Sequence, residues 1–563
     1  MRRPPQPPSP ARFNRRLLLA MAGSLAGFGL LAAQAWNLQV ASYDKYHALA
    51  EDNRITMLPL APQRGRILDR NGIVLAEDVY TPALEIATSQ ARNVDRLVQQ
   101  LSKIVPISPL EVRRFKRLAA GNKNTDGTIP LKTRLTDEEA ARLAAVRFRF
   151  DGLEIKARPH RHYPLGTTAA HVIGHIGRIS NADNDMLART ERTSDYAGST
   201  HIGKLGLEQS YETQLHGKVG LEEVEITASG RPVRSLSRQP ATPGQDIRLA
   251  LDIPLQQLAE ELLAGYRGAL VAIEPRTGEV LAFVSMPSFD PNLFVDGIDH
   301  RNWQALNGDP DRPLLNRPLR GTYPPGSTFK PAQGAIFLQE GVIRPTDAFS
   351  CYHGFPPLNN RPACHSHGSP LSLVPALATS CNAFFCWGLR AMLDNRRFYP
   401  SVQEAFEHWK NRIVGLGFGY RLGLDLPGER RGYIPNSKVY DKAYKGRWNS
   451  STIISISIGQ GEILATPLQI ANLGVIIANR GRYRRPHVVK AIQGIPLDTA
   501  YTNWQNSGIS PANMEYIVEG MARAVTGGTC HAANFAPGEI EVCGKTGTAE
   551  NPHGKDHSAF LGF

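Results

Sequence analysis

The run Tyr323-Pro324-Pro325-Gly326-Ser327-Thr328-Phe329-Lys330 carries the first indication of fold and chemistry. Two prolines and a glycine cannot continue a helix backward, so the run predicts a turn that places Ser327 at or near a helix start. On that helix, positions i and i+3 share one face, so the amine of Lys330 can reach the hydroxyl of Ser327. The spacing S-x-x-K therefore predicts a serine nucleophile with a lysine as its base.

Two further motifs follow in order, Ser380-Cys381-Asn382 (S-x-N) and Lys545-Thr546-Gly547-Thr548 (K-T-G-T). An S-x-x-K motif alone occurs by chance in most long chains, whereas all three in this order are strong evidence. Ser380 can relay a proton between Lys330 and a leaving amine, and the Asn382 side chain can hold a substrate amide.

The third motif supplies charge and donors for a substrate carboxylate. Lys545 is a cation that would also lower the pKa of Lys330, as burial would. The hydroxyls of Thr546 and Thr548 can bond the same carboxylate, and Gly547 leaves room for a substrate backbone along the strand. The backbone N–H groups of Ser327 and Thr548 would form the oxyanion hole.

With these motifs the chain resembles the class B penicillin-binding proteins, and more closely their elongation-type group than the division-type group. The resemblance covers residues 17 to 563. Four segments carry it outside the active-site motifs, and Phe289–Phe294 with Leu306–Arg317 favour the elongation type. The four are Arg64–Gly72, Gly206–Gly217, Thr277–Ala282 and Gly459–Gln469.

The resemblance implies an α+β protein with one N-terminal transmembrane helix. A cytoplasmic tail (1–16) and an anchor (17–37) precede a juxtamembrane segment and extended α/β pedestal, the dimerisation-type domain of the class (38–242). A transpeptidase domain of the β-lactamase type (243–563) follows, with an antiparallel sheet flanked by helices and an all-α subdomain. Relatives continue with a further strand and a long helix, so we expect 559–563 to be a strand of a C-terminally truncated or damaged domain with poor stability.

The implied activity is that of a peptidoglycan D,D-transpeptidase. It would cross-link stem peptides ending in D-Ala-D-Ala during cell elongation, through an acyl-enzyme on Ser327 that β-lactams trap, with no catalytic cofactor. Two alternatives stay open: a non-catalytic scaffold that activates a SEDS-family glycosyltransferase, and a β-lactamase or β-lactam sensor of the same fold. The implied partners are the membrane, the SEDS-family glycosyltransferase RodA and other elongation-complex proteins.

The segment from Leu17 to Trp36 has no charged residue, and about 20 residues at 1.5 Å each span roughly one hydrocarbon thickness. Five arginines precede it, which favours a cytoplasmic N-terminus and a periplasmic bulk at the bacterial inner membrane. The alternative is a cleaved signal peptide, because Ala33-Gln34-Ala35 resembles a cleavage site. The apolar run is longer than the usual apolar region of a signal peptide, which favours an uncleaved anchor.

The net charge of +13, from 64 basic and 51 acidic residues, raises the question of nucleic acid. No zinc finger, RRM or helix-turn-helix pattern supports nucleic-acid binding. A basic surface facing anionic lipid headgroups or cell-wall polymer fits better.

Six cysteines in an oxidising compartment make disulfides the default expectation, and Cys530 with Cys543 could close a short loop. Cys351, Cys364, His365, His367 and Cys381 are residues of the types that ligate zinc. Some elongation-type relatives carry zinc beside the S-x-N motif, and this resemblance implies a structural zinc on Cys351, Cys364, His367 and Cys381. A Cys351–Cys364 disulfide and free thiols are the alternatives, and we expect Cys386 to be a small buried residue.

Local patterns predict several elements. Helical stretches are expected at 43–53, 93–104, 136–146 and 371–389, the last interrupted at Ser380. Strands are expected at 247–251 and 540–548, and Asp252 should cap the helix that follows the first of them. A hairpin is expected from 268–273 and 279–284.

Overall fold

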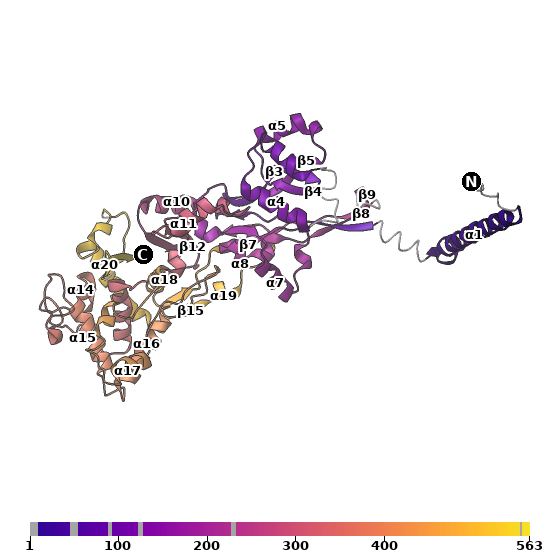
Figure 1. Ribbon diagram of the computed structural model, residues 1–563. Coiled ribbons are helices and arrows are strands. Elements are labelled where there is room, and N and C mark those ends of the chain that lie inside the picture. The colour runs from indigo at the N-terminus through magenta and orange to yellow at the C-terminus, as the bar shows by residue number, and fades with distance from the viewer. Residues whose placement is uncertain are drawn as a thin grey trace, which may run out of the picture. The chain divides into compact units, whose positions relative to one another are not determined.

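The computed structural model describes residues 10–44, 55–87, 93–121, 128–226, 232–536, 538–551 and 554–563. Contacts divide the chain into two compact units, each formed from separate stretches (Figure 1). The first unit holds Met1–Ala61, Pro82–Ala157 and Val219–Ala241, and the second holds Pro62–Thr81, Arg158–Lys218 and Thr242–Phe563.

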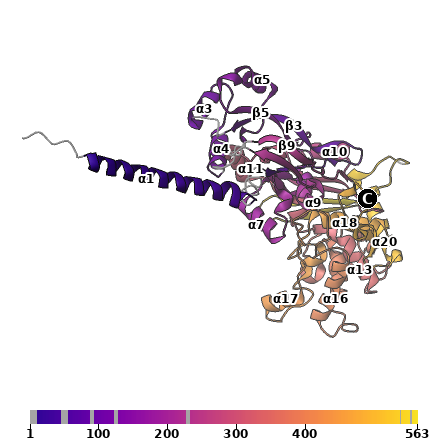
Figure 2. The same ribbon diagram turned by 90° about the vertical axis from the view of Figure 1, so that its right-hand side faces the viewer.

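The N-terminal helix α1 (Pro10–Trp36) continues into a short π-helical turn, Asn37–Ala41. Figure 2 shows α1 as one uninterrupted helix. The stretch Leu17–Ala41 is long and apolar enough to cross a membrane, and none of its most apolar part is buried in the protein. The structure is therefore consistent with a single-pass anchor. The helix expected at 43–53 lies almost entirely outside the described residues.

The first unit contains an antiparallel sheet of three strands, in the order β1 (Ile55–Leu60), β8 (Gly220–Ile226) and β9 (Pro232–Gln239). A second cluster buries Leu84, Leu101, Phe115 and Leu143 in one core. It combines the end of β3 (Val74–Ala87) with β4 (Thr128–Lys132), β5 (Leu153–His162), α3 (Val94–Leu101), α4 (Pro109–Gly121) and α5 (Asp137–Val146).

Side-chain caps fix two of these helices where the sequence predicts them. Asn93 accepts a hydrogen bond from the backbone N–H of Arg96 at the start of α3. Thr136 and Glu139 form a reciprocal capping box at the start of α5. Each cap satisfies backbone donors that have no partner within the helix, so the expected starts are confirmed.

The second unit begins with short elements around a buried ion-pair network. They are β2 (Ile67–Leu68), α6 (Ala170–Ile173), β6 (His175–Arg178), α7 (Asn181–Arg189), β7 (His201–Leu205), α8 (Gly206–Ser210) and α9 (Glu212–His216). Arg64 pairs with Glu208 and Glu212 at 2.6 Å each, and Arg161 pairs with Glu208 at 2.8 Å. The network joins segments that are far apart in the sequence.

The remaining strands of this unit form pairs and one small mixed sheet. β10 (Ile247–Leu249) lies between β2 and β14 (Val489–Ile492), and β13 (Arg482–Arg484) pairs with β15 (Trp504–Asn506). β11 (Gly268–Ile273) with β12 (Val280–Met286) forms the expected hairpin, and Asp252 caps α10 as expected. β16 (Gly544–Ala549) pairs with β17 (His557–Gly562), but β16 begins four residues later than expected.

Helices make up most of the rest of the unit (Figure 2), and they hold its largest core. The helix α13 (Lys330–Gln339) lies at the centre, with all but its last residue buried. The other helices are α10 (Ile253–Leu262), α11 (His300–Gly308), α12 (Arg317–Arg320), α14 (Leu373–Ala378), α15 (Asn382–Leu393), α16 (Val402–Gly415), α17 (Ser437–Tyr444), α18 (Pro467–Ala478), α19 (Thr499–Thr502) and α20 (Pro511–Gly527).

Candidate active site

Ser327 lies on a 3-10 turn, Gly326–Phe329, that leads directly into α13. Gly326 has a φ of +54°, and a Cβ there would lie 2.6 Å from the carbonyl oxygen of Thr548. The Gly326 N–H donates to the carbonyl of Gly459 at 2.9 Å. These contacts explain why the turn needs glycine, and they confirm that Ser327 stands at a helix start.

Lys330 is fully buried beside the S-x-N motif. Its Nζ donates to the Ser380 carbonyl at 2.6 Å, to Ser380 Oγ at 3.1 Å and to Asn382 Oδ1 at 2.6 Å. Burial lowers the pKa of Lys330 to about 8, because desolvation disfavours the charged amine. A buried amine whose pKa lies near neutrality is suited to accept a proton from Ser327.

The S-x-N motif occupies a sharp break between two helices. Ser380 has a left-handed φ of +57° between α14 and α15, which confirms the predicted interruption. The sulfur of Cys381 caps α15 by accepting from the Phe384 N–H. Asn382 Nδ2 donates to the Ala363 carbonyl at 2.5 Å. The loop before α14 therefore holds the side chain of Asn382, whose Oδ1 accepts a hydrogen bond from Lys330.

The strand β16 brings the K-T-G-T motif to the serine turn. A Cβ on Gly547 would lie 2.8 Å from Thr328 Cγ2 and 3.1 Å from the Pro325 carbonyl, so the strand packs directly on this turn. Lys545 is buried and donates to the Thr546 carbonyl at 3.0 Å. Burial, and then the nearby cation of Lys330, lower the pKa of Lys545 to about 7.

The structure thus brings together all three motifs predicted from the sequence. It adds two contacts that the sequence analysis missed. Thr546 Oγ1 donates to Thr529 Oγ1 at 3.2 Å, and the ring of Tyr323 lies edge-on to that of His557 at 5.2 Å. Tyr323 stood in the quoted run without a role, whereas nothing in the sequence pattern singles out Thr529 or His557.

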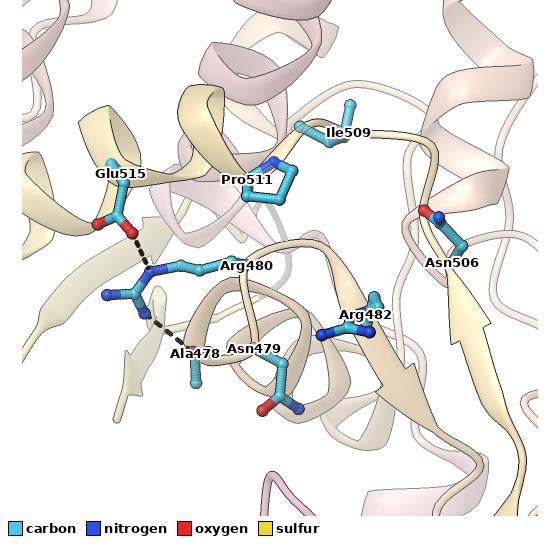
Figure 3. A pocket seen from close by; sticks show the side chains of 8 residues that line it. All are labelled: Ala478, Asn479, Arg480, Arg482, Asn506, Ile509, Pro511 and Glu515. Atoms are coloured by element: carbon cyan, nitrogen blue, oxygen red, sulfur yellow. Dashed lines mark hydrogen bonds and ion pairs between the residues drawn. The ribbon is translucent and has the colours of Figure 1, made fainter.

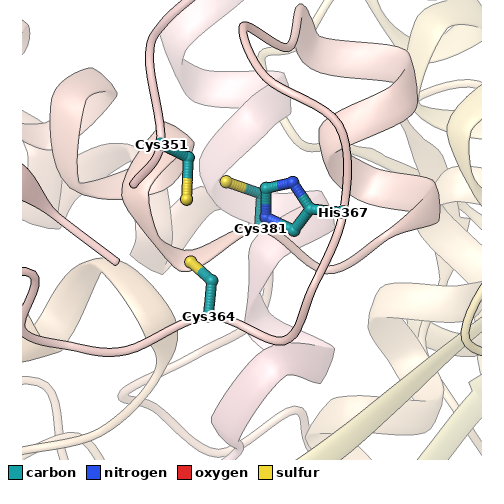
Figure 4. A group of neighbouring side chains, drawn as sticks. All are labelled: Cys351, Cys364, His367 and Cys381. Atoms are coloured by element: carbon teal, nitrogen blue, oxygen red, sulfur yellow. The ribbon is translucent and has the colours of Figure 1, made fainter. Parts of the chain in front are cut away.

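Cys351, Cys364, His367 and Cys381 form a compact cluster (Figure 4). One ligand atom of each lies within 4.8 Å of the others. His365, also considered from its type, is not part of it. The six cysteines are free thiols in the structure, so neither the Cys530–Cys543 nor the Cys351–Cys364 disulfide is present, and Cys386 is fully buried as expected.

The donor set of this cluster fits a zinc ion. The pKa of Cys364 is lowered to about 4, first by a hydrogen bond with Cys381, and its sulfur accepts from the backbone N–H groups of Asn382 and Ala383. His367 Nε2 is buried without a hydrogen-bond partner, while Nδ1 lies 2.7 Å from the Gly368 carbonyl. A thiolate and an unpartnered imidazole nitrogen oriented by a backbone carbonyl are typical zinc ligands.

The comparisons with known proteins agree with the assignment made from these motifs. The family model described as the penicillin binding protein transpeptidase domain matches residues 268–563, and the one described as the penicillin-binding protein dimerisation domain matches residues 59–249. This chain belongs to the penicillin-binding protein family. Its class B relatives include the peptidoglycan D,D-transpeptidase MrdA of Escherichia coli K12, 36% identical over 96% of this chain and 84% of that protein. MrdA of Acinetobacter baumannii is 35% identical over 98% of this chain and 82% of that protein.

Solved structures of penicillin-binding protein 2 (PBP2) share the fold. The structure of Pseudomonas aeruginosa PBP2 in complex with WCK 5153 has a TM-score of 0.65 and 30% identity, and the match covers 90% of this chain and 89% of that one. Helicobacter pylori PBP2 in complex with MreC has a TM-score of 0.74 at 24% identity, over 90% and 92% of the two chains, which supports the fold. The elongation-type assignment made from the sequence is confirmed.

Proposed function

We propose that this penicillin-binding protein is a peptidoglycan D,D-transpeptidase of cell elongation, with Ser327 as its nucleophile. The observation that carries the assignment is the buried Lys330, bonded to Ser380 and Asn382 beside the serine turn. The named D,D-transpeptidase relatives and the matched transpeptidase domain support the same reaction class.

Acylation begins when Ser327 Oγ attacks the carbonyl carbon of the penultimate D-Ala, and the serine proton passes to the neutral amine of Lys330. The backbone N–H groups of Ser327 and Thr548 stabilise the resulting oxyanion. The C–N bond then breaks, Ser380 relays the proton to the leaving amine, and terminal D-Ala departs. An amine of a neighbouring stem then attacks the ester carbonyl and gives a proton to Lys330. The ester C–O bond breaks as the cross-linking amide forms, and the proton returns from Lys330 to Ser327 Oγ.

The two lysines divide these tasks because they lie close enough to repel each other. Lys330 has three oxygen acceptors for its protons, whereas the one acceptor the structure gives Lys545 is the Thr546 carbonyl. In the free enzyme the shared proton therefore favours Lys330. A substrate carboxylate beside Lys545 would raise the pKa of that lysine, so that Lys545 holds the proton. Lys330 would then be neutral and ready to act as the base.

The decisive experiment is the intact mass of the full-length protein after incubation with benzylpenicillin. We expect a stable adduct of one drug molecule, and none on Ser327→Ala. Consumption of the drug without an adduct would indicate a β-lactamase instead. Absence of both adduct and drug consumption would favour the non-catalytic scaffold.

We also propose that a structural zinc occupies the Cys351–Cys364–His367–Cys381 cluster, apart from the chemistry at Ser327. The free His367 nitrogen and the Cys364 thiolate support it. The metal would supply no catalytic step. It would fix the loop that bonds Asn382 through Ala363 and Cys364, and so fix the acceptor of the Lys330 amine.

Membrane orientation and partners complete the proposal. The N-terminus would be cytoplasmic and both units periplasmic at the inner membrane, because the arginines precede the apolar helix. The partner would be the SEDS glycosyltransferase RodA, since a related chain was solved in a peptidoglycan synthase complex described as coordinating polymerization and crosslinking. Protease added to spheroplasts should digest the protein, and protection from the protease would contradict the periplasmic orientation. RodA should co-purify with the protein from detergent extracts, and failure to co-purify would contradict the proposed partner.

A further inference from the structure

A cavity of about 550 Å³ lies between the end of α18, the β13–β15 ribbon and the start of α20 (Figure 3). Its polar wall consists of Asn479, Arg480, Arg482, Asn506 and Glu515, and Ile509 and Pro511 add apolar surface. The volume is in the range of sites for small ligands. None of these residues belongs to the catalytic motifs or to the cysteine cluster.

The charge of this cavity is positive and only partly compensated. Arg480 Nε pairs with Glu515 at 2.8 Å, and Arg480 Nη1 donates to the Ala478 carbonyl at 2.9 Å. Arg482 is exposed and, among the described residues, has no carboxylate within ion-pair distance; its guanidinium lies 5.4 Å from the centre of the Trp504 ring. One carboxylate thus faces two guanidinium groups.

The neighbouring ribbon adds to this imbalance. Arg482 is opposite Asn506 and Arg484 is opposite Trp504, so the four side chains share one face of the β13–β15 pair. The Arg484 guanidinium lies 4.7 Å from the Trp504 ring centre, and its Nε is buried without a hydrogen-bond partner. The two arginines therefore flank one tryptophan, and neither is neutralised by an acidic group of the described chain.

The two amides leave complementary hydrogen-bonding groups. Asn479 Nδ2 donates to the Pro275 carbonyl at 2.6 Å, which leaves its Oδ1 as an acceptor. Asn506 Oδ1 accepts from the Gly508 N–H at 2.8 Å, which leaves its Nδ2 as a donor. One free donor and one free acceptor match the two polar groups of a peptide bond, and a guanidinium matches a carboxylate in a two-point geometry.

We propose that this cavity binds a short acidic peptide, with a ligand carboxylate on Arg482 and a peptide group between Asn479 and Asn506. The assignment rests on the proposed function for the identity of the ligand: the stem peptide of a neighbouring peptidoglycan strand is the acidic, amide-rich polymer that this enzyme meets. The cavity would hold a second strand beside the catalytic unit without reacting with it.

The site is separate from Ser327 and can be tested with the active site blocked. The helix α18 begins just after Ala465, whose backbone bonds Tyr323 four residues before Ser327, and it ends at the cavity. Twelve residues of helix put about 18 Å between these two ends. A ligand at Arg482 therefore does not compete with an acyl group on Ser327.

The experiment is calorimetric titration of the full-length protein in detergent, acylated beforehand with benzylpenicillin. The probe is the tripeptide L-Ala-γ-D-Glu-meso-diaminopimelate, compared with the same tripeptide carrying amidated carboxyl groups and with inorganic phosphate. We expect saturable binding of the free acid, at least tenfold tighter than that of the amidated form or of phosphate. Arg482→Gln should weaken binding at least tenfold, and Arg447→Gln, an exposed arginine of another loop, should leave it unchanged.

A second readout locates the ligand. In protein labelled with 5-fluorotryptophan, the ¹⁹F resonance that disappears in Trp504→Phe should shift with the free acid. No saturable binding, equal binding by Arg482→Gln, or phosphate binding as tightly as the tripeptide would each overturn the proposal. A missing benzylpenicillin adduct would instead contradict the proposed function, so the two failures are distinguishable.

Discussion

At the scale of single residues, the chemistry depends on which of two buried lysines is protonated. Lys330 and Lys545 have pKa values lowered to about 8 and about 7, first by burial in each case. The cation of Lys330 contributes to the lowered pKa of Lys545, so Lys545 loses its proton before Lys330 does in the free enzyme. In the reactive form only one of the two amines is protonated. The neutral amine acts as the base, and the charged amine binds the substrate carboxylate.

We expect the rate constant for acylation by benzylpenicillin to be bell-shaped with pH. Below about 7 both amines are protonated and no base is available, and above about 8 neither amine is charged to hold the carboxylate. The maximum should lie between these values, measured by stopped-flow or quenched mass spectrometry from pH 5 to 10. A rate that keeps rising to pH 10 would show that a charged Lys545 is not needed.

At the level of single elements, the close approach of β16 to the serine turn sets the active-site geometry. A Cβ at Gly547 would lie 2.8 Å from Thr328 Cγ2, closer than real contacts allow, and 3.1 Å from the Pro325 carbonyl oxygen, which is a tight contact. We expect Gly547→Ala to push the strand away and to slow acylation at least tenfold, because a displacement of about 1 Å costs up to a hundredfold in rate.

The control for that variant is Gly527→Ala, at the end of α20. A Cβ there would meet nothing within 4 Å, and Gly527 does not have a left-handed φ. Its acylation rate and melting temperature should stay near the parent values. Normal acylation by Gly547→Ala would mean that the strand can shift without disturbing the substrate.

The loop before α14 is the second element that sets the active-site geometry, because the sulfur of its Cys364 accepts from the backbone N–H groups of Asn382 and Ala383. Metal analysis of the purified protein should find one zinc per chain, and Cys364→Ser should lose it. Since Cys364 accepts from the backbone N–H groups at the start of α15, that variant should also acylate several-fold more slowly. Cys530→Ser, a buried thiol outside the cluster, should keep its zinc; a parent protein without metal would contradict the proposal.

On the scale of the whole molecule, the Arg64–Arg161–Glu208–Glu212 network joins segments of the second unit that are far apart in the sequence. Glu208 is fully buried, and Arg161 and Arg64 hold its pKa below the usual value against the effect of burial. Removing its charge leaves two buried guanidinium groups without their shared partner. Such a loss costs about 3–5 kcal/mol.

We therefore expect Glu208→Gln to lower the free energy of unfolding by roughly that amount, measured by denaturant titration of the full-length protein. Glu519→Gln removes an exposed pair with Arg523 and should change the stability by less than about 1 kcal/mol. Equal effects of the two variants would show that the buried network contributes no more than a surface ion pair.

Local sequence determined much of this protein. The Pro-Pro-Gly run fixes a turn because its residues cannot extend a helix, and Asn93, Thr136 and Asp252 cap the helices they precede. The apolar run after the arginines determines α1, although the helix begins at Pro10, before that run. These features depend on neighbours in the chain, so they are visible without a fold. The family resemblance then supplied the activity.

The tertiary structure decided what depends on distant neighbours. The burial that lowers the pKa values of Lys330 and Lys545, the meeting of Thr529 with Thr546, and the grouping of segments 62–81 and 158–218 with the C-terminal unit all arise from long-range packing. The late start of β16 has the same origin, because a strand begins where its partner does and β17 ends at Gly562, opposite Gly544. Composition and spacing cannot report such contacts, since desolvation and cross-strand pairing exist only once the chain is folded.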